Sequence, residues 1–205
     1  MEVLKIFEFL RDEIHTVVMA TAGEDGTPVT CAIDIMDCDA GGLYFLTARG
    51  KNFYSRLKAR PNISLTGIAG DSTLTRVAVS VSGRAEELGW EGLSRLLDKN
   101  AYMYKIYPTE LSRRALCAFK LCEGSGEVFD LTKTPVERFS FSFGGLGKGS
   151  GYIINEKCSL CGRCLEVCPQ NCISLGSMTA KIAQSNCLRC GNCMAVCPAG
   201  AVKRQ

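Results

Sequence analysis

Short segments that alternate apolar and polar residues fill most of the first 143 positions, and this period of two predicts β-strands. Turns rich in Gly, Pro and Asp separate them, such as the stretch GEDGTP at 23–28. The expected strands are 17–22, 28–36, 41–47, 63–69, 74–88, 115–131 and 136–143. Six or seven strands with few helices favour a small antiparallel split barrel, so the expected fold is mainly β.

Three segments follow a helical period instead. The first, MEVLKIFEFLRDEIH, is expected to be an amphipathic helix with one apolar face. Its apolar face would consist of Val3, Leu4, Ile6, Phe7, Leu10 and Ile14. Residues 49–62 predict a second helix that ends at Pro61, and residues 89–108 predict a third that ends at Pro108. No apolar run reaches the roughly 18 residues that a membrane helix needs, and the first segment lacks the features of a secretory signal.

Two cysteine runs near the C-terminus carry the strongest chemical signal. They read CSLCGRCLEVCP at 158–169 and CLRCGNCMAVCP at 187–198, both of the form C-x2-C-x2-C-x3-C-P. Structural zinc prefers two distant CxxC pairs, and a redox dithiol needs one CxxC, so neither explains three cysteines within seven residues. The runs belong to an internal repeat, because 152–174 aligns with 181–203. Each half predicts a strand, a cysteine loop, a short helix and a strand, and the halves are expected to pack together.

This segment resembles the bacterial two-[4Fe–4S] ferredoxins. The resemblance implies two cubane clusters and a small α+β ferredoxin domain in which the fourth cysteine of each run crosses to the other cluster. One implied ligand set is Cys158, Cys161, Cys164 and Cys197, and the other is Cys187, Cys190, Cys193 and Cys168. Cys172 aligns with Ala201 and is expected to be a small buried residue beside a cluster, not a ligand.

Composition and charge agree with this interpretation. The chain has 205 residues, of which 46% are hydrophobic and 13 are cysteines. Five cysteines lie outside the two runs without paired spacing, so a disulfide framework is not expected, and we expect a reducing cytoplasmic location. Residues 151–205 hold six basic and two acidic side chains, a net of +4, whereas the whole chain carries +3. The basic residues flank the cysteine runs, where they would offset cluster charge, so neither nucleic acid nor membrane is an expected partner.

The strand-rich segment resembles the pyridoxamine 5′-phosphate oxidase-like split barrels over roughly residues 10–140. The motifs that carry the resemblance are a DG-x-P turn, a Tyr-Phe-x-Thr strand end, a Lys opening the next helix, a Pro-Asn pair and a V-x-V-x-G-x-A-E strand. The resemblance implies that FMN binds with its phosphate near Thr47 and Lys51, with Arg49 and Asn52 as further candidates. The backbone of the second strand, including Ala32 and Ile33, would line the flavin ring, and a homodimer is implied because FMN usually lies between two subunits.

The chain also departs from the true oxidases of this family. They carry an arginine early in the second strand, where this chain has Cys31, and a C-terminal signature with Trp and Arg that is missing here. The one histidine, His15, precedes the barrel and is expected at a helix end. Vitamin B6 oxidation is therefore not the expected function.

The expected organisation is a flavin-binding split barrel at 1–142, a Gly-rich linker at 143–151 and a ferredoxin domain at 152–205. FGGLGKGS at 143–150 lacks the positions of a phosphate-binding P-loop. The combination predicts an iron–sulfur flavoprotein oxidoreductase that passes electrons between two [4Fe–4S] clusters and FMN, and exchanges them with a redox protein or small molecule. Two alternatives stay open: an electron-transfer or redox-sensing module without its own substrate, and a barrel that has lost flavin. The substrate and the electron donor are not specified by these patterns.

Overall fold

A computed structural model describes residues 2–145 and 151–204. Most of the expected linker, residues 146–150, lies outside the described residues. The described chain forms two compact units. The first contains residues 2–69, 78–127 and 141–145, and the second contains residues 70–77, 128–140 and 151–204.

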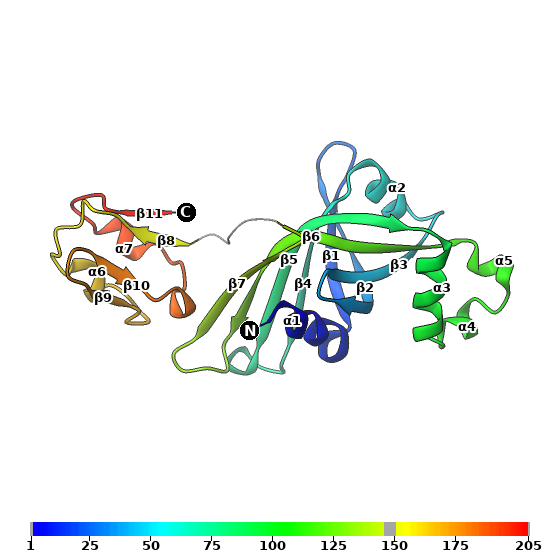
Figure 1. The fold of residues 1–205 in the computed structure, drawn as a ribbon, viewed down its shortest axis with the longest axis horizontal. Coiled ribbons are helices and arrows are strands. Elements are labelled where there is room, and N and C mark those ends of the chain that lie inside the picture. The colour runs from blue at the N-terminus through cyan, green and yellow to red at the C-terminus, as the bar shows by residue number, and fades with distance from the viewer. Residues whose placement is uncertain (1, 146–150, 205) are drawn as a thin grey trace. The chain divides into compact units, whose positions relative to one another are not determined.

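The N-terminal strands form a closed antiparallel barrel, which confirms the expected fold class (Figure 1). Its strands are β1 (Thr16–Ala22), β2 (Pro28–Asp39), β3 (Gly42–Ala48), β4 (Asn62–Ala69), β5 (Val77–Leu88) and β6 (Leu116–Asp130). They pair in the order β3-β2-β1-β4-β5-β6, and β3 also pairs with β6, which closes the ring. Strand β7 (Glu137–Phe143) flanks β6. The closing register places Thr47 opposite Cys117.

Alternation along the strands puts one side of each into the barrel core. In β1, Val17 and Met19 are fully buried, whereas Val18 between them is 56% exposed. Phe45 of β3 and Phe119 of β6 stack inside with ring centroids 5.7 Å apart. This alternation is the period of two on which the sequence-based prediction relied.

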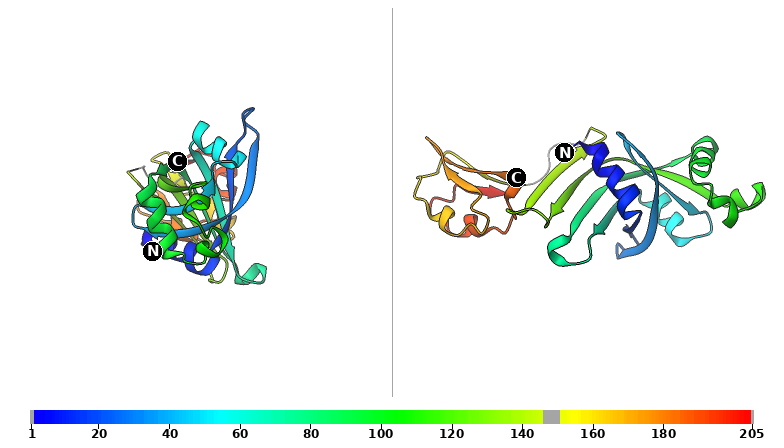
Figure 2. Two further views of the ribbon diagram at one scale, coloured as in Figure 1. Left: turned by 90° about the vertical axis from the view of Figure 1, so that its right-hand side faces the viewer. Right: turned by 90° about the horizontal axis from the view of Figure 1, so that it is seen from below.

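Helix α1 (Val3–Phe9) and the π-helical turn Leu10–Ile14 that continues it pack against the barrel (Figure 2). The expected apolar face is confirmed at its centre, because Ile6, Phe7 and Leu10 are buried. His15 ends this segment with a positive φ of 60° and a ψ of −63°, as expected of a helix-end residue. Helix α2 (Asn52–Ala59) ends before Pro61 as expected.

The helix expected at 89–108 is wrong as a single element. The structure divides it into α3 (Trp90–Lys99) and α4 (Met103–Ile106), and a short α5 (Glu110–Arg113) follows. The break falls at Asn100, whose side-chain amide donates to the carbonyls of Leu96 and Met36, at 2.8 and 3.0 Å. A side chain that hydrogen-bonds the backbone in this way competes with the helix and ends it.

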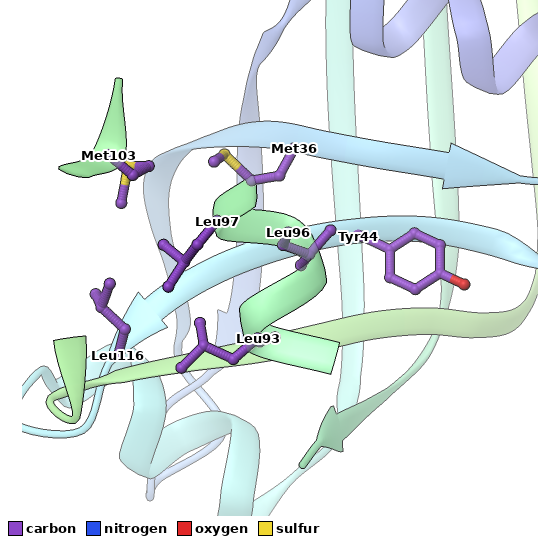
Figure 3. Packing of buried hydrophobic residues seen from close by; sticks show 8 residues of the cluster. Met36, Tyr44, Leu93, Leu96, Leu97, Met103 and Leu116 are labelled. Carbon is purple, nitrogen blue, oxygen red and sulfur yellow. The ribbon is translucent and has the colours of Figure 1, made fainter. Parts of the chain in front are cut away.

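Helix α3 covers a hydrophobic cluster at one side of the barrel, shown in Figure 3. The buried members of the cluster are Met36, Tyr44, Leu93, Leu96, Leu97, Met103, Leu116 and Ala118. Leu93, Leu96 and Leu97 recur at helical spacing and meet residues from β2, β3 and β6. The apolar stripe of the helix is therefore what holds it on the barrel.

The cysteine-rich segment folds as the internal repeat predicts. Each half supplies a strand, a loop, one turn of helix and a second strand. The elements are β8 (Tyr152–Ile154), α6 (Arg163–Glu166), β9 (Ile173–Leu175), β10 (Ala180–Ile182), α7 (Asn192–Ala195) and β11 (Val202–Arg204). Strand β8 pairs with β11 and β9 with β10, so each small sheet takes one strand from each half. Within the described residues, no helix is long and apolar enough to cross a membrane.

Candidate functional site

Two thiol-lined cavities lie in the cysteine-rich module. The first has about 350 Å³ of empty space, part of it open to solvent, and Cys158, Cys161, Cys164 and Cys197 line it. The second has about 330 Å³ of empty space, again partly open to solvent, and its wall includes Cys168, Cys187, Cys190 and Cys193. The structure thus brings the eight cysteines together in the two groups that the ferredoxin resemblance implies, each with one member from the other run.

The loops that carry these thiols follow the same backbone path in both halves. Leu160 and Arg189 occupy equivalent left-handed positions, with φ of 57° and 56°, and a left-handed glycine follows each of them two residues later. A non-glycine residue rarely adopts this conformation, so the surrounding structure constrains both loops where they curve around their cavities. All thirteen cysteines are free thiols in the structure. The described residues contain no group of three or more His, Cys, Asp or Glu side chains placed to hold a single metal ion.

Backbone N–H groups point at several of the sulfur atoms. The N–H of Ala201 donates to Cys197 Sγ at 3.3 Å, and that of Arg189 donates to Cys187 Sγ at 3.4 Å. Burial opposes ionisation of Cys197, but backbone hydrogen bonds outweigh it and lower the pKa of this thiol. Hydrogen bonds to sulfur stabilise the thiolate, which is the form that binds iron. Burial raises the pKa of Cys193, so iron binding there would release a proton.

Cys172 lines the second cavity as a fifth thiol. Its side chain is buried, and its Sγ lies 3.4 Å from Cys168 Sγ. Burial, with the neighbouring Cys168, raises the pKa of Cys172 to about 12. It stands beside the four other thiols, in the place where the other half has the fully buried Ala201. Its burial agrees with the expectation of a small buried residue, and that Cys172 is not a ligand stays a prediction.

On the barrel, Thr47 is a sequence-predicted residue whose buried hydroxyl lacks a hydrogen-bond partner among the described residues. It lies near the end of β3, and only 3% of its surface is exposed. No hydrogen-bond partner for its Oγ1 is found among the described residues. A buried hydroxyl without a partner costs about 1–3 kcal/mol, so the position suits a ligand that supplies an acceptor.

Arg49 lines a hollow of about 850 Å³ of empty space, part of it open to solvent. Its guanidinium donates to Glu87 Oε1 and to the Tyr54 hydroxyl, both at 3.3 Å. Lys58 donates to Glu87 Oε2 at 2.8 Å. Burial would raise the pKa of Glu87, but Lys58 and Arg49 outweigh it and the pKa falls below the ordinary 4.5. Glu87 and Lys58 were missed by the sequence analysis, which used the segment around Glu87 only as a strand motif.

Asn52 lies in a different hollow, of about 910 Å³, together with Arg56 and Arg60. It is the first residue of α2, and Lys51 precedes it as an exposed residue. The first turn of α2 has no acidic residue and no side-chain cap, so its N–H groups are open to an anion. Arg56 and Arg60 were also missed, because their spacing within a basic helix resembles an ordinary solvated face.

Ala32 and Ile33 lie on β2, opposite Val18 and Val17 of β1. Ala32 is exposed and Ile33 is half-buried. The lining of neither hollow includes them. The four phosphate candidates thus follow one another along the chain, at Thr47, Arg49, Lys51 and Asn52. Arg49 and Asn52 nevertheless line different hollows. Ala32 and Ile33 line neither of the two.

Comparison with protein families identifies the two parts. Residues 5–120, more than half of the chain, match the pyridoxamine 5′-phosphate oxidase family, so the chain belongs to that family. Residues 157–201 match the 4Fe–4S dicluster domain. The second match supports binding of [4Fe–4S] clusters, and the two together point to redox chemistry and electron transfer. A comparison with curated proteins found no match.

Solved structures share the fold of the barrel. A NimC/NimA family protein from Clostridium acetobutylicum is 15% identical with a TM-score of 0.58, over 69% of this chain and 92% of the other. The conserved hypothetical protein Rv2991 from Mycobacterium tuberculosis is 19% identical with a TM-score of 0.55, over the same two shares. A Clostridium acetobutylicum protein related to general stress protein 26 is 20% identical with a TM-score of 0.52, over 68% and 93%. At these identities the likeness concerns the fold alone.

Proposed function

We propose that this protein is an iron–sulfur flavoprotein oxidoreductase that passes electrons between two [4Fe–4S] clusters and FMN. The observation that carries the proposal is the pair of four-thiol cavities in a chain whose other part belongs to a flavin-associated barrel family. A cluster exchanges one electron and FMN exchanges one or two, so a protein that holds both can couple one-electron and two-electron partners.

In this proposal the protein holds one cluster by Cys158, Cys161, Cys164 and Cys197 and the other by Cys168, Cys187, Cys190 and Cys193. Their side chains supply the thiolates, and the N–H groups of Ala201 and Arg189 offset negative charge on sulfur. The cavity walls also include apolar residues such as Ile154 and Val202, which limit solvent access. These are the features by which a protein tunes cluster potential.

The barrel would hold FMN by its phosphate. Thr47 Oγ1 would donate to a phosphate oxygen and so gain the partner it lacks within the chain. The open first turn of α2 and the charge of Lys51 favour a dianion, with Arg49 and Asn52 at the sides of the same stretch. The backbone at Ala32 and Ile33 would face the flavin ring. Since Ala32 is exposed in the single chain, we propose that FMN binds between two copies.

The external partner is proposed as a redox protein or a small molecule. His15, the one histidine of the sequence, ends the turn before β1, with Nδ1 3.3 Å from the carbonyl of Arg11 and Nε2 3.8 Å from Asp34 Oδ2, so the barrel strands themselves contain no histidine. The lack of a histidine base in the barrel strands favours the second candidate function, an electron carrier or redox sensor without a substrate of its own. Steady-state reduction of quinones, nitroaromatics and enoates would distinguish an enzyme from a carrier.

The first experiment is anaerobic purification followed by counting of iron, sulfide and acid-released FMN. About eight irons and one FMN per chain are expected. Stoichiometric reduction of the clusters, followed by absorbance at the flavin bands, should then show electrons reaching FMN. Eight irons without flavin, even after reconstitution, would leave a ferredoxin on a flavin-free barrel. Loaded protein whose reduced clusters fail to reduce the flavin would overturn the proposal.

A further inference from the structure

The hairpin of β6 and β7 contacts the cysteine-rich module within the second compact unit. Residues 128–140 of this hairpin and residues 151–204 belong to the same unit. The N–H of Val136 donates to Gln170 Oε1 at 3.1 Å, and the carbonyl of Val136 accepts from Asn186 Nδ2 at 3.4 Å. The Arg189 side chain donates to the Ser140 hydroxyl. The hairpin therefore binds both loops of the second cavity. Its partners there are each within two residues of a cysteine that lines the cavity, and they are Gln170, Asn186 and Arg189.

One of these contacts lies on a direct path to a predicted ligand sulfur. Arg138 Nη1 donates to the carbonyl of Leu188 at 2.7 Å. The peptide bond that begins with this carbonyl ends at the N–H of Arg189, which donates to Cys187 Sγ at 3.4 Å. A donor on the carbonyl polarises the peptide and strengthens the bond made by its N–H. Arg138 is itself held over the Phe129 ring, with 5.5 Å from Cζ to the ring centroid.

The repeat supplies an internal comparison for this path. Ser159 and Leu160 occupy the positions of Leu188 and Arg189 in the first half, and Leu160 has nearly the same φ. Each loop has its own basic side chains, Lys157 and Arg163 at the first and Arg189 in the second, so neither loop is without a nearby cation. The difference lies in Arg138, a side chain from outside the repeat that binds the second loop.

We propose that Arg138 is a positioning residue that raises the reduction potential of the cluster bound at Cys187, and thereby makes the two clusters of the symmetric repeat inequivalent. The proposal rests on the cluster part of the proposed function and is independent of flavin. A stronger N–H bond to sulfur, together with a guanidinium nearby, stabilises the more negative reduced cluster. In the module reduced by one electron, the cluster bound at Cys187 is therefore the one that is mainly reduced.

The test is a redox titration of the full-length, cluster-loaded protein, followed by electron paramagnetic resonance. In Arg138→Met, one of the two cluster steps should become about tenfold less favourable, which is about 59 mV for a one-electron couple. The other step should stay in place. Cys190→Ser and Cys161→Ser, one in each loop, assign the steps to the clusters. Arg138→Lys keeps the charge and a hydrogen-bond donor, so the potential of this cluster should stay close to the wild-type value.

A matched control separates the hydrogen-bond path from general charge. Lys133 is an exposed cation in the turn of the same hairpin, and Lys133→Met should leave both steps unchanged. The inference is wrong if Arg138→Met moves neither step, moves both equally, or does no more than Lys133→Met. If Arg138→Met fails to load iron, Arg138→Gln decides in its place, with faster hydrogen exchange at the Arg189 amide as the expected second readout. Absence of iron from the wild type would instead refute the proposed function.

Discussion

Thr47 is the residue at which flavin binding and stability can be separated. Its buried hydroxyl has no partner among the described residues, and valine has nearly the same shape. We predict that Thr47→Val weakens FMN binding by about tenfold, the worth of one hydrogen bond of roughly 1.4 kcal/mol. The flavin-free barrel should unfold at the same or slightly higher urea concentration. Fluorescence titration with FMN and urea unfolding measure the two effects, and a loss of stability without a loss of affinity would contradict the assignment.

Glu87 should make barrel stability depend on acid pH. Its pKa is lower in the folded chain than the ordinary 4.5, despite the opposing effect of burial. A carboxyl of this kind stabilises the fold above its unfolded pKa, and the contribution is lost as pH falls through the folded pKa. We predict that Glu87→Gln lowers the unfolding free energy at pH 7 and that the difference from wild type shrinks progressively below about pH 4.5.

Urea unfolding followed by the fluorescence of Trp90, the single tryptophan, measures this difference across pH. The neighbouring Glu86→Gln is the matched control, because its side chain is 58% exposed. Its effect should stay within about 0.5 kcal/mol. A Glu87→Gln difference that is constant down to about pH 3 would show that the ion pairs with Lys58 and Arg49 contribute nothing.

Among the elements, helix α3 depends on its apolar stripe more than on its caps. No side chain caps its N-terminus, whereas Leu96 is completely buried in the cluster of Figure 3. We predict that Leu96→Ala lowers the unfolding free energy by about 2–5 kcal/mol, because it leaves a cavity against β2 and β3. Leu111→Ala in α5 is the matched control, since Leu111 is 76% exposed and should change stability by less than about 0.5 kcal/mol. Equal effects of the two substitutions would refute this packing.

For the whole molecule, the decisive feature is that each cavity takes a cysteine from the other half. We predict that Cys197→Ala reduces iron from about eight to about four per chain. Adding Cys161→Ala, from the first run, should cost no further iron, whereas adding Cys190→Ala, from the second run, should remove the rest. Cys172→Ala is the control and should keep about eight irons. The opposite pattern in the double variants would show that each run binds its own cluster.

Local patterns in the sequence predicted the barrel strands, the amphipathic first helix and both halves of the repeat, because these depend on the period of nearby residues. The single helix expected at 89–108 was wrong, since the bonds from the Asn100 side chain to the backbone give no periodic signal. Glu87 and Lys58 were missed for a similar reason. Their pairing joins β5 to α2, and neither residue has a distinctive neighbour in the sequence.

By itself the sequence determined the number and spacing of the thiols, the order of the strands and the repeat, since these follow from the positions of residues along the chain. Only the tertiary structure decided which thiols share a cavity, how β3 meets β6 to close the barrel, and that Arg138 reaches the loop of Cys187. The physical reason is that contacts between distant segments come from packing of whole elements, which depends on all the buried faces at once.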